Sequence, residues 1–206
     1  MSGAKAIKIA LFAVVLPVVT FISILVFMGH REPMVIARTL TQSPQLADYG
    51  AVASFSMIER SGRAMTLEEL KGSPWVASFM FTQCAGQCPT MNFKIMGLQG
   101  KLPGDTKIIS FSVDPENDTP AVLSRYAKQF NPDPERWFFL TGEKPEIDSL
   151  LKSFHVNSSD DPMLHSLRLV LIDGEGRIRG YYNTGEDEAL GKLLSDLSLI
   201  RKEGLS

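Results

Sequence analysis

A run of seven largely apolar residues at positions 75–81 restricts the fold of this chain more than any other feature. A short, uninterrupted apolar run of this kind is typical of a β-strand that is buried on both faces. Such a strand belongs to a sheet that helices cover on both sides, and ligand sites in these folds lie beyond the carboxyl ends of the strands. Cys84 and Cys88, the only two cysteines, follow this run directly.

Strand-like and helix-like segments alternate around this run. Strands are expected at 54–57, 63–65, 75–81, 107–113, 137–140, 167–172 and 177–182. Helices are expected at 66–72, 89–102, 120–130, around 147–154 and at 190–200. This order predicts an α/β fold in which a mixed central sheet is flanked by helices and preceded by an N-terminal β-hairpin.

The composition excludes several classes of protein. The chain has 23 acidic and 21 basic side chains, a net charge of -2, and therefore lacks the basic surplus that nucleic-acid binding requires. A hydrophobic content of 44% is enough for a packed core. Two cysteines are too few for a disulfide-rich scaffold, a four-thiolate zinc site or an iron–sulfur cluster. The two thiols therefore act as a pair or together with other kinds of ligand.

Residues 9–28 form a second apolar run, which contains no charged side chain. About 20 such residues span a bilayer as a helix, and the run is longer than the ~7–15 residues of a signal-peptide core. We expect a single transmembrane helix that is retained, with a cleaved signal peptide as the alternative. Residues 1–8 are then a short cytoplasmic tail, 29–50 a tether and 51–206 the folded domain.

The location of the folded domain is predicted from the flanks of this run. Two basic residues precede the run and two follow it within ten residues, so the positive-inside rule gives little guidance. The eight residues before the run leave no room for an arginine-rich transit peptide. We expect a bacterial inner membrane, with the domain facing the periplasm or the cell exterior.

The spacing of the two cysteines leaves their chemistry open. If the helix begins at Pro89, Cys88 is its N-cap and Cys84 lies in the preceding loop. The positive end of the helix then lowers the pKa of Cys88, and thiolates are both nucleophiles and metal ligands. With Gly86 between them, the two thiols can close on a metal or on each other as a disulfide. Two structural core cysteines are the plainer alternative.

His165 is the one histidine of the three that can join the cysteines. In a thioredoxin-like sheet, the loop before its strand faces the loop that carries Cys84 and Cys88. A lone histidine at the start of a strand is otherwise more often an ordinary surface residue. Two thiolates and an imidazole suit copper, because thiolates select Cu(I) and imidazole extends the site to Cu(II). A closed zinc site needs a fourth ligand, for which the candidates are Asp160, Asp161 and Met163.

Four segments of the chain resemble, in the expected order, the Sco/SenC family of membrane-anchored copper proteins. These segments are 81–91, 112–120, 137–142 and 165–174. The resemblance extends from about residue 55 to 199 and implies a thioredoxin-like fold. It also implies that Cys84, Cys88 and His165 are copper ligands. The implied role is to deliver copper to the binuclear copper site of cytochrome c oxidase, or to reduce the cysteines of that site.

Two positions depart from the family pattern. Gly86 and Leu164 stand where many members have an acidic residue, and fewer nearby carboxylates imply weaker stabilisation of a cationic metal site. The partner implied by the resemblance is the copper-accepting subunit of cytochrome c oxidase or another exported copper protein.

Three functions remain open at this point. The first, which we expect, is a copper carrier without enzymatic turnover. The second is a membrane-tethered thiol:disulfide oxidoreductase with Cys84 and Cys88 as its redox-active pair, and the third is a sensor. The three-residue spacer counts against the oxidoreductase, since such enzymes normally use Cys-x-x-Cys. His165 favours the copper carrier.

Overall fold

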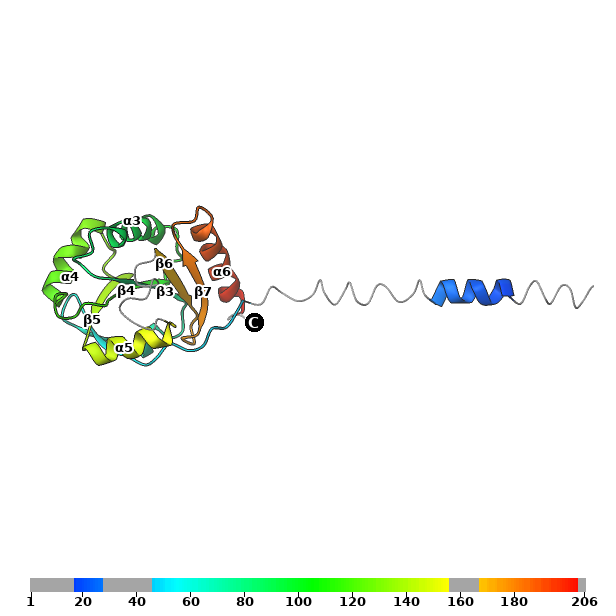
Figure 1. Ribbon diagram of the computed structural model, residues 1–206, viewed down its shortest axis with the longest axis horizontal. Coiled ribbons are helices and arrows are strands. Elements are labelled where there is room, and N and C mark those ends of the chain that lie inside the picture. The colour runs from blue at the N-terminus through cyan, green and yellow to red at the C-terminus, as the bar shows by residue number, and fades with distance from the viewer. Residues whose placement is uncertain (1–16, 28–45, 156–166, 204–206) are drawn as a thin grey trace, which may run out of the picture. The chain divides into compact units, whose positions relative to one another are not determined.

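The computed structural model describes residues 17–27, 46–155 and 167–203 (Figure 1). Residues 1–45 and 46–206 form separate units. In its described residues the second unit contains seven strands: β1 (Ser56–Glu59), β2 (Ala64–Thr66), β3 (Trp75–Met80), β4 (Lys107–Ser112), β5 (Trp137–Thr141), β6 (Arg168–Ile172) and β7 (Ile178–Asn183). Its helices are η1 (Leu67–Leu70), α3 (Gln87–Gln99), α4 (Pro120–Ala127), η2 (Lys128–Phe130), α5 (Lys144–Ser153) and α6 (Ala189–Glu203).

The seven strands form one mixed sheet in the order β2-β1-β5-β4-β3-β6-β7. β3 pairs in parallel with β4, and β4 with β5, whereas β1, β6 and β7 join by antiparallel pairing. All six residues of β3 are buried, as its apolar sequence predicts. The prediction of a mixed α/β sheet with an N-terminal hairpin is therefore confirmed.

Helices cover both faces of this sheet (Figure 1). One hydrophobic cluster joins the sheet to α3, α4 and α6, and includes Cys88. The other joins it to α5 and to the segment that leads into β1 and η1. β3 and β4 contribute side chains to both clusters, because successive side chains of a strand point to opposite faces of the sheet.

Local sequence signals explain several element boundaries. Thr66 and Glu69 form a capping box, in which the backbone N–H of Thr66 donates to the Glu69 carboxylate at 3.0 Å. The helix expected at 66–72 is a shorter 3-10 helix, Leu67–Leu70. Thr119 caps α4, and Pro120 is the first residue of this helix, which agrees with the start of the helix expected at 120–130. Gly176 has a φ of 82° in the turn between β6 and β7.

The compact unit begins at Leu46, five residues before the start that the pattern predicts. The backbone N–H of Tyr49 donates to the Ile178 carbonyl at 2.9 Å. Asp48 also forms an ion pair with Arg177 at 2.6 Å. Residues 46–50 are therefore part of the folded domain.

The apolar run at 9–28 is described only over residues 17–27, which form a helix with exposed side chains. Within the described ranges, no helix combines the length and the apolar character that crossing a membrane requires. The other residues of the predicted span lie outside the described part of the chain.

The strand directions define two opposite edges of the sheet. At the first, which we call the cysteine edge, β3 and β4 end and β6 begins, so residues 81–88, 113–119 and Leu167 lie together. At the second, which we call the arginine edge, β3 begins and the turn from β6 to β7 lies beside it. The predicted position of the cysteines beyond the carboxyl end of β3 is thus confirmed.

Candidate functional site

Cys84 and Cys88 lie on either side of the point where the loop after β3 becomes helix α3. Residues 81–84 form a turn in which the backbone N–H of Cys84 donates to the Phe81 carbonyl at 3.2 Å. Cys84 is half-buried, whereas only 4% of the Cys88 surface is exposed. Both thiols are free, and the backbone N–H of Cys88 donates to the Cys84 sulfur at 3.5 Å. The two cysteines therefore form one site, of which Cys84 is the accessible member.

Helix α3 begins earlier than predicted, and this changes the role of each thiol. The helix starts at Gln87 with Gly86 as its N-cap, so Cys88 lies inside the first turn and is not the N-cap. The prediction that Pro89 opens the helix was wrong by two residues. Pro89 still lies in the first turn, where no intrahelical partner for its missing N–H is needed.

The pKa values of the two thiols consequently shift in the direction opposite to the prediction. Burial raises the pKa of the Cys88 thiol to about 12, helped by its contact with Cys84. Burial also acts to raise the pKa of Cys84, but hydrogen bonds from the Cys88 thiol and from the N–H groups of Cys88, Gly86 and Gln87 outweigh it and lower the pKa. The positive end of α3 thus stabilises the Cys84 thiolate.

A buried aspartate, which sequence reasoning included in the segment 112–120 without giving it a role in the site, supports the cysteine loop. Asp118 is completely buried, and its carboxylate accepts hydrogen bonds from the Thr82 backbone N–H at 3.0 Å and from the Thr82 hydroxyl. It also accepts one from the Ser112 hydroxyl at 2.5 Å. The segment 112–120 does not by itself reveal this role, because the partner Thr82 comes from another loop.

A buried phenol lies close to the thiols on the α3 side of the sheet. The hydroxyl of Tyr126 accepts a hydrogen bond from the side-chain amide of Asn92 at 3.0 Å. Burial raises the pKa of Tyr126, and the neighbouring charges of Cys88, Cys84 and Asp118 raise it further. Tyr126 therefore stays protonated and gives the inner side of the site a neutral lining.

His165 lies outside the described residues, so its predicted place beside the cysteines stays a prediction. Leu167, two residues further along, packs against the same hydrophobic cluster as Cys84 and Phe81. Within the described ranges, no group of three or more His, Cys, Asp or Glu side chains has the geometry of a metal site. Leu164 and the candidate fourth ligands 160, 161 and 163 also lie outside these ranges.

His155 is the one histidine among the described residues, and it takes no part in the cysteine site. Its Nδ1 atom lies 2.9 Å from the hydroxyl of Tyr181. Its backbone adopts a φ of 60° just after the end of α5. These contacts agree with the expectation that, of the three histidines, only His165 can join the cysteines.

The donor chemistry at the cysteine edge fits a soft metal ion. Two thiols in mutual contact, one of them with a lowered pKa, supply two sulfur ligands without a large change in the fold. The same pair can form a disulfide. The fold and the site together define a thioredoxin-like protein that handles metal ions or thiols at the end of strand β3.

Comparison with known proteins identifies the family. Residues 43–197 match the SCO1/SenC family, and the chain belongs to this family. The chain is 36% identical over 155 residues to the SCO1 protein homolog of Bacillus subtilis. The aligned region covers 71% of this chain and 80% of that protein.

Solved structures of relatives share the fold. The structure of BsSco, described as a member of the Sco family of cytochrome c oxidase assembly proteins with a disulfide switch, is 33% identical. It matches with a TM-score of 0.69 over 79% of this chain and 99% of that one. A SCO1/SenC family lipoprotein from Bacillus anthracis is 26% identical, with a TM-score of 0.67 over 78% and 99% of the two chains. Bradyrhizobium japonicum ScoI with copper bound is 29% identical, with a TM-score of 0.59 over 73% and 99%.

Proposed function

We propose that this protein binds copper through Cys84, Cys88 and His165 and delivers it to the copper-accepting subunit of cytochrome c oxidase or to another exported copper protein. The observation that carries the proposal is the pair of adjacent free thiols beyond the end of strand β3, in a thioredoxin-like domain of the SCO1/SenC family. A relative with the same fold has been solved with copper bound, which supports the choice of metal.

The division of labour between the thiols follows from their surroundings. Cys84 is half-buried and is the thiol that an incoming ion or partner meets first, because its pKa is lowered and Cys88 is buried behind it. Cys88 has to lose its proton when the metal binds, since thiolates are the ligands. Binding therefore releases a proton from the interior of the site. His165 supplies the nitrogen ligand that favours Cu(II).

Metal analysis tests this proposal directly. The full-length protein is exposed to Cu(I) under reducing conditions, freed of unbound metal and analysed for bound copper, alongside Cys84→Ser and Cys88→Ser. We expect about one copper per chain for the unchanged protein and loss of retained copper in each variant. Full retention by both variants contradicts the cysteine site.

A second candidate function is reduction of the cysteines of an exported copper protein. The observation that favours it is the lowered pKa of Cys84 beside a second thiol, which suits attack on a disulfide. His165 separates the two functions, because thiol exchange needs no imidazole. If copper delivery is the role, a His165→Ala strain loses oxidase activity at limiting copper and recovers part of it with added copper. Normal oxidase activity at limiting copper favours the reductase.

We further propose that residues 9–28 anchor the protein in a bacterial inner membrane, with 1–8 in the cytoplasm and the cysteine domain outside it. The uncharged run of 20 residues supports this proposal. Protease added to intact spheroplasts is expected to digest the domain while a cytoplasmic marker survives. Protection of the domain from the protease contradicts the orientation.

A further inference from the structure

The turn that carries Cys84 is tied to a neighbouring loop through a single buried side chain. Thr82 is the second residue of the turn 81–84, and both its backbone N–H and its hydroxyl donate to Asp118. Asp118 belongs to the connection between β4 and α4, where its own backbone N–H donates to the Asp114 carbonyl at 2.9 Å. The carboxylate thus joins the connections that follow β3 and β4.

Both oxygens of this carboxylate are occupied. One accepts from the Thr82 hydroxyl, and the other accepts from the Thr82 N–H at 3.0 Å and the Ser112 hydroxyl at 2.5 Å. The Ser112 oxygen in turn accepts from the Asp114 N–H at 3.2 Å. Every donor is a neutral group, and among the described residues no basic side chain forms an ion pair with Asp118.

Burying the Asp118 carboxylate without a cation costs free energy. A buried carboxylate without a cation loses the hydration that stabilises its charge, and proteins rarely keep one where an uncharged residue would serve. This one lies beside the cysteines, and the nearby phenol of Tyr126 is affected by the charges of Cys84, Cys88 and Asp118 alike. Asp118 is thus a buried polar group that is joined directly to the loop of the cysteines.

We propose that Asp118 is a positioning residue for the Cys84–Cys88 pair. By clamping Thr82, it fixes the turn 81–84 and so holds the Cys84 sulfur at the N–H groups that open α3. The fixed turn raises the effective concentration of one thiol near the other, which favours both disulfide formation and joint binding of a metal ion. This inference extends the proposed function, but it concerns the geometry of the thiols and not the identity of the metal.

The test measures how readily the two thiols form a disulfide in the full-length protein, with no copper present. In a glutathione buffer the two thiols lose two protons and two electrons, and one oxidised glutathione becomes two reduced ones. Asp118→Ala removes the clamp, and we expect the equilibrium constant for disulfide formation to fall by at least about tenfold. Asp118→Asn keeps an acceptor oxygen for the Thr82 N–H and should cost about threefold, as for one weakened hydrogen bond.

Thr82 supplies a matched pair of variants in which the buried residue is untouched. Thr82→Val keeps the shape of the side chain but removes the hydroxyl donor, and we expect a fall between those of the two Asp118 variants. Thr82→Ser restores the hydroxyl and should match the unchanged protein. If Asp118→Ala does not fold, the contrast between Thr82→Val and Thr82→Ser decides the question alone.

Asp173→Ala controls for a general loss of stability. Asp173 is also a buried aspartate that accepts backbone hydrogen bonds, but it lies at the arginine edge. We expect it to lower stability and to leave the glutathione equilibrium unchanged. If Asp118→Ala and Thr82→Val leave that equilibrium unchanged as well, Asp118 is only a structural residue and the inference is overturned. Failure of the copper proposal would appear in a different experiment. It would be shown by copper retention in Cys84→Ser and Cys88→Ser.

Discussion

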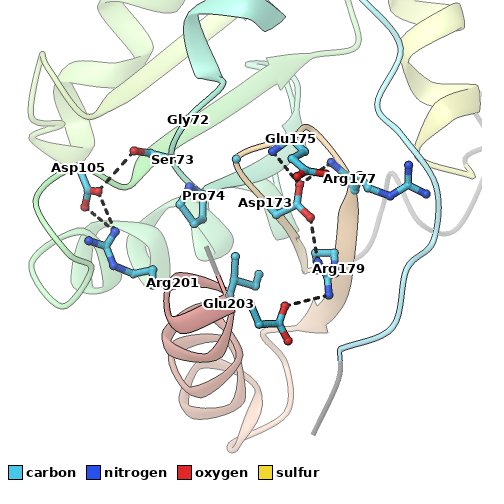
Figure 2. Close-up of a pocket in the computed structure, with 12 residues that line it drawn as sticks. Gly72, Ser73, Pro74, Asp105, Asp173, Glu175, Arg177, Arg179, Arg201 and Glu203 are labelled. Carbon is cyan, nitrogen blue, oxygen red and sulfur yellow. Dashed lines mark hydrogen bonds and ion pairs between the residues drawn. The ribbon is translucent and has the colours of Figure 1, made fainter. Parts of the chain in front are cut away.

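Asp118 and Asp173 are both buried aspartates in the connections that follow a β-strand, and they lie at opposite edges of the same sheet. Asp173 forms an ion pair with Arg179 at 3.0 Å, in a cavity of about 490 Å³ that Figure 2 shows. Asp118 accepts hydrogen bonds from neutral donors, and no basic side chain in the described ranges pairs with it.

The arginine edge is a set of opposite charges that satisfy one another. Arg179 also reaches Glu203 at 3.4 Å, and Arg201 contacts Asp105 at 2.7 and 2.8 Å (Figure 2). These pairs connect the end of α6 to neighbouring segments of the chain, and most of the charged residues that line the cavity take part in an ion pair. The charged lining of this cavity is therefore explained by structural ion pairs.

The cysteine edge has the opposite character. Its buried polar groups include the Cys88 thiol, the Ser112 hydroxyl and the Asp118 carboxylate, and burial raises the pKa values of Cys88 and of the neighbouring Tyr126. The comparison teaches that the chemistry of this protein is to be sought where polar groups are held in place without counterions. The predictions below test that contrast.

The largest effect is expected from the cysteines themselves. Cys84→Ser or Cys88→Ser should lower Cu(I) affinity by more than the ~10–100-fold that loss of an outer hydrogen-bond partner costs, because a sulfur ligand is removed. Competition with a Cu(I) chelator of known affinity measures the change. Arg179→Ala, at the other edge, should retain copper normally, and an equal loss there would remove the distinction between the two edges.

A large but selective effect is expected from His165. His165→Ala should weaken Cu(II) binding by at least ~10–100-fold and Cu(I) binding less, because Cu(I) is satisfied by two thiolates whereas Cu(II) prefers nitrogen donors. Parallel titrations with the two oxidation states measure the difference. The glutathione equilibrium of Cys84 and Cys88 should stay unchanged, and equal losses of both oxidation states would argue against a nitrogen ligand.

The next largest effect concerns how the reactivity of each thiol depends on pH. Cys84 should react with iodoacetamide at a lower pH than a free thiol, because hydrogen bonds at the start of α3 lower its pKa. Cys88 should remain protonated and slow until pH approaches about 12, since burial favours the neutral thiol. Rate–pH profiles of Cys88→Ala and Cys84→Ala report each thiol separately. A lower midpoint for Cys88 would restore the original prediction that this cysteine is the helix cap.

The smallest effect on the cysteine site is expected from a substitution at the arginine edge. Arg179→Ala leaves Asp173 buried without its cation and should lower the free energy of unfolding by about 1–3 kcal/mol. Denaturant titration measures this loss. Copper retention and the glutathione equilibrium should not change, and a change in either would show that the two edges are coupled.

Much of the fold follows from local patterns in the sequence. The apolar run at 75–81 predicts the buried central strand β3, and the helix expected at 120–130 begins at the residue where α4 begins. Both succeed because the relevant interactions lie within a few residues of one another or depend on burial of a whole segment. The position of the cysteines at the end of β3 follows for the same reason.

The details of the site required the tertiary structure. Local signals place the helix start at Pro89, but packing of Cys88 into the core below α3 moves the start to Gln87. This shift turns the helix N–H groups toward Cys84 and reverses the order of the two pKa values. A cap preference of one residue is worth about 1 kcal/mol, which burial of a side chain readily exceeds.

The sequence by itself determined the α/β class, the two thiols at a strand end and the resemblance to a copper-binding family, because each is encoded in contiguous residues. Only the tertiary structure decided which thiol is the accessible and acidic one, and that Asp118 holds the loop beside it. Thr82 and Asp118 are 36 positions apart, and their hydrogen bonds form only when the parallel pairing of β3 with β4 brings their ends together. Contacts of that range are created by the packing of the sheet, and no local pattern records them.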